Sequence, residues 1–165
     1  LMSLLTDIDA LNRLSKLQKD YFLIDFEPAM IPRITPRGTD AIYFKYIPRF
    51  SEILAHYAQL GPAYMACYKG KIICMFGCLP LWNGVGEAWL ITDVSLPNHA
   101  RPFHRVTKII LDRFMSELNL VRLQITIHQS NVLAYKWAKV LYFKEEGVLR
   151  KFGPDGSNFY MMART

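Results

Sequence analysis

The sequence predicts a mixed α/β fold, in which one sheet combines an antiparallel meander, a β-α-β crossover and a C-terminal hairpin. The meander is indicated by three strand-like apolar runs in quick succession, at residues 63–68, 71–78 and 86–94. The dipeptides Lys69-Gly70 and Asn83-Gly84 between these runs are typical of tight turns. Connections this short join antiparallel neighbours.

The crossover is indicated by a change of hydrophobic period. Apolar residues recur at helical spacing between Phe103 and Leu118, and residues 122–128 then alternate as a half-buried strand. A strand, a long helix and another strand are most simply a right-handed crossover between parallel neighbours. A further helix capped by Ser130 and a hairpin around the turn at residues 153–156 complete the order.

The N-terminal part is predicted as an extension, residues 1–38, that precedes a domain at residues 39–165. Apolar residues at helical spacing predict a helix from Thr6 to Phe22 with Thr6 as its N-cap. Three prolines and one glycine in residues 27–40 predict an extended connector.

The first elements of the domain are predicted from two adjoining stretches. Residues 41–47 have the composition of a strand. Residues 48–61 are predicted to form a helix, with Pro48 in its first turn and Gly61 at its end.

Composition bounds the class of protein. The 165 residues, 52% of them hydrophobic, suffice for one core and not for two ordinary domains. No apolar run approaches the ~18 residues of a membrane span, and the start lacks a signal-peptide pattern, so a cytoplasmic protein is expected. Cys67, Cys74 and Cys78 lie in apolar sequence without metal-ligand spacing and are expected to be reduced core thiols. The net charge is +6, but the sequence contains no run of five basic residues, so nucleic-acid binding is not favoured.

The ligand site is predicted where the crossover helix begins. In such units the crevice lies at the carboxyl end of the first strand, where free N–H groups of the helix point at an anion. Here that end is residues 92–94, and the loop at residues 95–105 follows it. This loop has no glycine, but it carries Arg101, His104 and Arg105.

At these residues the chain resembles the GNAT acyl-CoA N-acyltransferase superfamily. The resemblance is carried by "TDVSLPNHARPFHRVTKIIL" (92–111) and by the N-x-x-A pair Asn131 and Ala134. "LYFKEEG" (141–147) stands where the family usually has L-G-F-x-x-E-G. The closest likeness is to divergent GNAT-like proteins of tailed bacteriophages, some of which accompany internal virion proteins.

The resemblance implies acetyl-CoA as co-substrate, an amine acceptor of unknown identity and no required metal. The coenzyme A ester would lie in a splayed gap between the strands at residues 86–94 and 122–128. Backbone groups near Thr92 and Val94 would pair its pantetheine arm, and Asn131 would help to hold it.

The phosphates would be held differently from those of typical members. The family loop is R/Q-x-x-G-x-G/A, whereas this chain has bulky residues there and Pro102 offers no N–H. Side chains of Arg101, His104 and Arg105 could reach the phosphates instead. The alternative is a solvated basic helix start without a ligand.

Two acidic residues are candidates for the general base, Asp93 first and Glu87 second. For Asp93, a helix or loop cap is an equally good interpretation. Many family members place a proton-donating tyrosine seven residues after the Asn, where this chain has Ala138.

Two functions follow from these features. The first is a phage-encoded N-acetyltransferase of the host cytoplasm that transfers an acetyl group to an amine of a protein or small molecule. The second is a catalytically silent GNAT fold with a structural or assembly role in a phage virion, where the N-terminal helix would dock on a partner.

Overall fold

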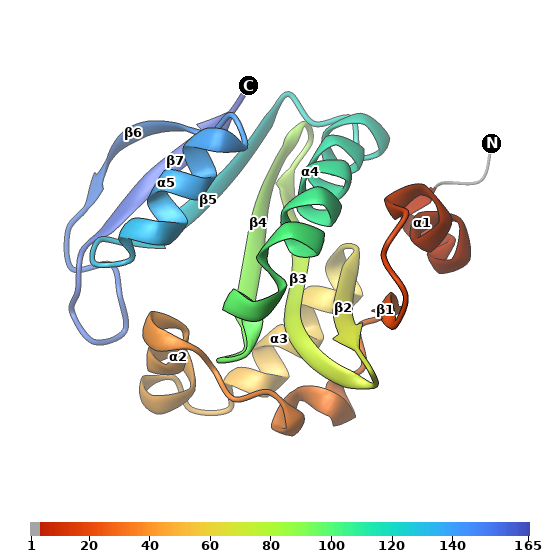
Figure 1. The fold of residues 1–165 in the computed structure, drawn as a ribbon. Helices are drawn as coiled ribbons and strands as arrows, with labels where there is room; N and C mark the ends of the chain where they lie inside the picture. The colour runs from red at the N-terminus through yellow and green to blue at the C-terminus, as the bar shows by residue number, and fades with distance from the viewer. Residues whose placement is uncertain (1–3) are drawn as a thin grey trace.

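The computed structural model describes residues 4–165, whose strands form a single sheet with the order β1-β2-β3-β4-β5-β7-β6 (Figure 1). The strands are β1 (Tyr21–Asp25), β2 (Ala63–Tyr68), β3 (Lys71–Trp82), β4 (Val85–Thr92), β5 (Arg122–His128), β6 (Lys144–Leu149) and β7 (Phe159–Arg164). Neighbouring strands are antiparallel except β4 and β5, which are parallel. The predicted mixed fold, with its meander, crossover and hairpin, is confirmed.

Helices cover both faces of the sheet (Figure 1). The α-helices are α1 (Ile8–Ser15), α2 (Ala41–Tyr46), α3 (Phe50–Leu60), α4 (Ala100–Glu117) and α5 (Val132–Val140). Short 3-10 helices are η1 (Leu4–Thr6), η2 (Pro28–Arg33), η3 (Gly38–Asp40) and η4 (Leu96–His99). No helix in the described part of the chain combines the length and apolar character that a membrane span requires.

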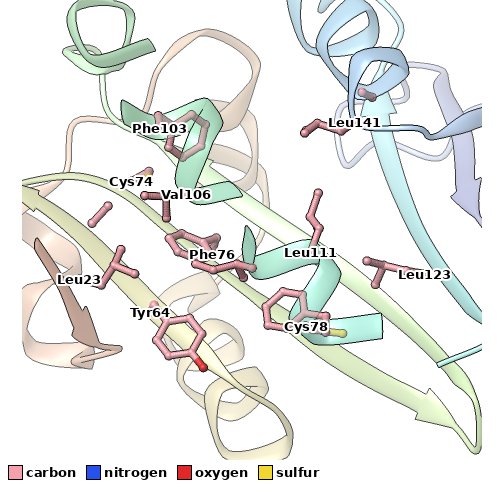
Figure 2. Packing of buried hydrophobic residues seen from close by; sticks show 14 of the residues in the cluster. Leu23, Tyr64, Cys74, Phe76, Cys78, Phe103, Val106, Leu111, Leu123 and Leu141 are labelled. Carbon is pink, nitrogen blue, oxygen red and sulfur yellow. The ribbon is translucent and has the colours of Figure 1, made fainter. Parts of the chain in front are cut away.

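The sheet is buried on both faces because its strands alternate between two apolar clusters. Ala88 and Leu90 of β4 pack in the cluster beneath α1, α4 and α5, part of which Figure 2 shows. Trp89 and Ile91, one residue out of phase, pack in the cluster beneath α3 and η2. Burying a large apolar side chain stabilises a fold by about 1.5–3 kcal/mol, so these two clusters hold the layers together.

The turns of the meander are as predicted. Lys69 and Gly70 have φ values of 48° and 76°, and Gly84 has a φ of 80°, which are left-handed conformations that tight hairpins use. Beyond the predicted strand, β3 continues to Trp82. The three cysteines are buried and free, and burial raises the pKa of the Cys78 thiol to about 12.

The N-terminal helix is shorter than predicted. Asp7, not Thr6, caps it by accepting a bond from Ala10 N, and it ends at Ser15, where Lys16 turns left-handed with a φ of 45°. The apolar residues that continue the helical spacing up to Phe22 belong to β1 instead. The prediction mistook a strand for the end of a helix, because its pairing partner β2 lies about forty residues away.

This N-terminal part packs on its own domain. Leu11 of α1 and Leu23 of β1 are 0% and 2% exposed in the cluster beneath α4. The Tyr21 hydroxyl lies 2.6 Å from His99 Nδ1 in the loop before α4. The apolar side of α1 is therefore occupied within the chain. Residues 1–3 of the predicted extension lie outside the described residues.

Residues 41–47, predicted as a strand, form helix α2 over Ala41–Tyr46. Its aromatic residues pack against α3: the Tyr43 ring stacks on Phe50 with centroids 5.3 Å apart, and the Phe44 ring meets Phe50 edge-on at 5.0 Å. Six residues are too few for the hydrophobic period to separate a helix from a strand, and the tertiary contact decides. Helix α3 confirms the helix predicted there, although it begins at Phe50.

Candidate functional site

The site is built around the opening between β4 and β5. These strands pair only at Val85, Gly86 and Glu87 of β4, opposite residues 122–124 of β5, and then diverge. The splayed gap expected from the resemblance is therefore present. Backbone groups of successive β4 residues point alternately to the two sides of the strand. Asp93 N donates to Ile73 O of β3, so the groups of the odd-numbered residues point to β3 and the N–H and C=O of Leu90 point to the gap.

A cavity of about 400 Å³ occupies this gap and reaches both faces of the sheet. On one face α4 and α5 contribute apolar walls, among them Phe103, Ile110 and Trp137. On the other face α2 and α3 contribute Tyr43 and Tyr57. A mostly apolar cavity with a few polar groups is typical of a small-molecule site.

Polar side chains enter the cavity at two places along β4. Glu87 lies where the strands part, and its Oε2 accepts a bond of 2.8 Å from Gln124 Nε2 of β5. This contact holds the carboxylate at the mouth of the gap. The structure thus places Glu87, one of the two predicted bases, in the cavity.

At the carboxyl end of β4 the cavity meets Asp40, which the sequence analysis did not single out. Asp40 Oδ2 lies 2.8 Å from Thr92 N and 2.6 Å from Thr92 Oγ1. Burial raises the pKa of the Asp40 carboxyl above its ordinary value, although the bonds from Thr92 and the charge of Arg37 counteract part of this effect. A buried carboxylate with a raised pKa is a better base near neutral pH than an exposed one.

Thr92 and Val94, expected to pair the pantetheine arm, have their backbone groups engaged by the chain. Arg37 N donates to Thr92 O at 2.8 Å, and Val94 N donates to Thr35 O at 2.9 Å. Residues 35–37 thus pair with the end of β4 like a short extra strand, and η3 follows and brings Asp40 to Thr92. We call residues 35–40 the strap. In this conformation Leu90, not Thr92 or Val94, presents free backbone groups to the gap.

Asp93, the first choice for the base, has a structural role. Its side chain is buried and is absent from the cavity wall. Its oxygens accept bonds from Thr35 N at 2.8 Å and from Ser95 N and Oγ at 2.8 and 2.5 Å. Burial raises its pKa, but these bonds and the charge of Lys71 lower it more, so the net shift is downward. These contacts are those of the loop cap that the sequence left open as the alternative to a base.

The basic residues predicted to hold phosphates lie on the first turns of α4. Arg101 and Arg105 are exposed, four residues apart and hence on one side of the helix. The helix begins without a side-chain cap, which leaves backbone N–H groups at its start for an anion. His104 is engaged instead: its Nδ1 accepts a bond of 2.9 Å from Trp137 Nε1 of α5.

Asn131 caps α5 in place of the predicted Ser130. Its Oδ1 accepts a bond from Ala134 N at 3.1 Å, and its Nδ2 lies 3.4 Å from Thr39 Oγ1. The Asn of the N-x-x-A motif therefore has a local role, since it caps the helix through the backbone N–H three residues later. Asn131 also lines the cavity beside the strap.

Comparison with solved structures identifies the fold. Ard1 from Thermoplasma volcanium superposes with a TM-score of 0.71 at 14% identity, covering 88% of this chain and 97% of that one. A GNAT-family acetyltransferase from Bacillus anthracis gives 0.67 at 15% identity, covering 90% and 96%. The protein yncA from Salmonella typhimurium, solved with its cofactor acetyl-CoA, gives a TM-score of 0.67 at 9% identity, covering 89% and 94%. No protein-family model matches the sequence, and the search of curated proteins found no match.

The chain therefore has the fold of the GNAT acetyltransferases. The similarity extends over nearly the whole of both chains. At identities of 9–15% it defines the fold, and the activity has to be argued from the cavity.

Proposed function

We propose that this protein binds acetyl-CoA in the gap between β4 and β5 and transfers the acetyl group to an amine. The observation that carries the proposal is the parting of β4 from β5 after three residue pairs, which opens a 400 Å³ cavity through the sheet. Backbone N–H and C=O groups left without hydrogen-bond partners in the centre of a sheet cost free energy, and a ligand that bonds to them removes this cost. The acetyl-CoA bound by the yncA protein supports this choice of ligand.

The residues present fit such a ligand at both ends. The backbone C=O of Leu90 offers the amide arm one strand-like hydrogen bond, which leaves the Leu90 N–H for the thioester carbonyl. The uncapped start of α4, with Arg101 and Arg105 on its exposed side, suits the phosphates. Pro102 and the bulky residues around it direct the phosphate contacts to side chains, since the backbone offers fewer donors there.

The chemistry is direct transfer. The amine nitrogen forms a bond to the thioester carbonyl carbon, the carbon–sulfur bond breaks, a base takes the amine proton and the thiolate leaves and is protonated. The N–H of Leu90 would stabilise the carbonyl oxygen as negative charge develops on it. Glu87 and Asp40 are the carboxylates that line the cavity, and either can take the proton directly or through water.

Thiol release tests this activity. The full chain is mixed with acetyl-CoA and a panel of primary amines, and free coenzyme A is followed with a thiol reagent. We expect release that depends on the amine and that falls about a hundredfold or more in the double variant Glu87→Gln, Asp40→Asn. Release that the double variant leaves unchanged would place the base elsewhere. The variant Asp112→Asn, on the exposed side of α4, serves as the control.

A silent GNAT fold is the second candidate, and the strap favours it. While residues 35–40 hold the backbone of Thr92 and Val94, the amide arm has only the hydrogen bond at Leu90. Under this second proposal the chain would act in a phage particle, the setting that the resemblance stated for the sequence implies. Absence of acetyl-CoA binding, together with co-sedimentation of the chain with virion components, would support this role.

A further inference from the structure

The strap pairs with the edge of β4 that faces the gap. Arg37 N donates to Thr92 O at 2.8 Å, and Val94 N donates to Thr35 O at 2.9 Å. Thr92 and Val94 are an even number of residues from Leu90, so their backbone groups point to the same side of the strand as those of Leu90. The strap thus lies beside β4 on the side from which β5 has parted, and it leads from there into α2 (Figure 1).

Under the proposed function the coenzyme A arm needs the same edge. The arm carries a second amide beyond the one that bonds to the C=O of Leu90. The next backbone groups on this edge, toward the start of α4 and the phosphates, are those of Thr92. Thr92 N and Oγ1 donate to Asp40, and Thr92 O accepts from Arg37 N. The second amide therefore has no free partner on β4 while the strap is in place.

Hydrogen bonds, and not buried side chains, hold the strap on β4. Every residue of the strap is at least partly exposed, whereas Ile34 just before it is buried. At Gly38 the chain turns with a φ of 54°, and a Cβ there would meet no atom within 4 Å, so this turn lies in open space. A segment with few buried apolar contacts opens at a lower free-energy cost than the core strands. The strap can therefore leave β4 while Ile34 and α2 keep their packing.

We propose that the strap is an autoinhibitory segment, which acetyl-CoA displaces from β4 when its arm binds. In the free chain the strap completes the edge of β4, and in the bound chain the arm bonds to Thr92 instead. This exchange breaks the bond from Thr92 N to Asp40, so the carboxylate is released into the cavity only when acetyl-CoA is present. It also breaks the contact of 3.4 Å between Asn131 Nδ2 and Thr39 Oγ1, which leaves the Asn131 amide for the ligand.

This inference rests on the proposed function, and amide hydrogen exchange tests it separately. Exchange in the full chain is followed by NMR with and without saturating acetyl-CoA, whose binding is measured by calorimetry. With acetyl-CoA the Arg37 N–H should exchange at least about tenfold faster, because the ligand takes its acceptor, Thr92 O. The Asp93 N–H, which donates to Ile73 O of β3, should stay protected and serves as the internal control.

Two variants of one strap residue isolate the hydrogen bond. Arg37→Pro removes the N–H that donates to Thr92 O, and the φ of Arg37, −89°, is close to the range of proline. Arg37→Ala loses the same guanidinium but keeps the N–H, so it is the matched control. Arg37→Pro should bind acetyl-CoA about fivefold or more tightly than Arg37→Ala, because more of its chains have an open strap. Thermal melting establishes that both variants are folded.

The outcomes separate the inference from the proposed function. If acetyl-CoA binds and the Arg37 N–H exchanges no faster, the strap stays on β4 in the complex, and the inference fails while the proposed function survives. Equal affinities of Arg37→Pro and Arg37→Ala would also overturn the inference. If acetyl-CoA does not bind to the full chain, the proposed function fails and the inference fails with it.

Discussion

The carboxylate of Asp40 accepts two hydrogen bonds from Thr92, one from its backbone N–H at 2.8 Å and one from its hydroxyl at 2.6 Å. The pair joins the start of α2 to the end of β4 and fixes the strap across the end of the gap. The contact connects the stability of the fold to the site, because the Thr92 N–H that Asp40 accepts lies where an amide of the coenzyme A arm would pair.

The first prediction concerns the pH dependence of this contact. Because folding raises the pKa of Asp40, the group contributes stability that is fully present below its unfolded value of about 3.9 and is lost as pH rises through the folded pKa. Asp40→Asn is neutral at every pH, so this decline should disappear from its unfolding free energy. Urea unfolding of both proteins from acid to neutral pH measures it. A decline that is identical in Asp40→Asn would show that another group causes it.

Asp93 should behave in the opposite way. Its pKa is lowered on folding, so its contribution to stability is present above the unfolded pKa and is lost as pH falls through the lower folded value. Asp93→Asn brings an amide N–H₂ toward the donors Thr35 N and Ser95 N, and we expect a loss of about 1–3 kcal/mol at neutral pH. Urea unfolding gives the value.

The matched control for Asp93 is Asp112→Asn. It breaks the ion pair of Asp112 with Arg164, in which the Asp112 side chain is 55% exposed. It should cost less than about 1 kcal/mol, as exposed pairs do. A cost for Asp93→Asn no larger than that of the control would contradict the capping role.

The phosphate contacts give a third prediction. If Arg101 and Arg105 hold the phosphates by their side chains, Arg101→Ala with Arg105→Ala should weaken acetyl-CoA by at least about tenfold and reduce the salt dependence of binding. The double variant Arg13→Ala with Arg49→Ala removes the same charge away from α4 and should leave affinity almost unchanged. Equal effects of the two double variants would mean that net charge alone matters.

The division of the chain at residue 38 can be tested by truncation. A chain that starts at Thr39 loses β1, the edge strand paired with β2, and the buried side chains of Leu11, Leu23, Ile31 and Ile34. We therefore expect it to lose a cooperative thermal transition, which circular dichroism would record. A cooperative melt of the truncated chain would instead support the separate domain that the sequence predicts.

The sequence predicts the sheet from β2 to β7 because each of these strands has either a tight turn or a clear period beside it. Lys69-Gly70 and Asn83-Gly84 mark the meander, and the alternation of residues 122–128 marks β5. The strand β1 and the helix α2 were not predicted, since both are short and their form depends on partners distant in sequence, β2 for one and α3 for the other.

The sequence predicts where the site lies in the fold, but not all of the side chains that line it. The gap and Glu87 follow from the resemblance and from the order of the strands. Asp40 could not be found, because a single Asp in a proline-bearing stretch gives no signal of the hydrogen bonds to Thr92 that bring it to the cavity. For Asp93 the sequence left base and cap open, and the bonds from Thr35 and Ser95 decide for the cap.

Calorimetric titration of the full chain with acetyl-CoA tests the central claim most directly. We predict one molecule bound per chain with a dissociation constant in the micromolar range, and loss of this binding in Ala134→Trp, whose indole would fill the cavity from α5. Thermal melting establishes that the variant is folded. Absence of binding to the natural chain, or binding that Ala134→Trp leaves unchanged, would contradict acetyl-CoA binding between β4 and β5.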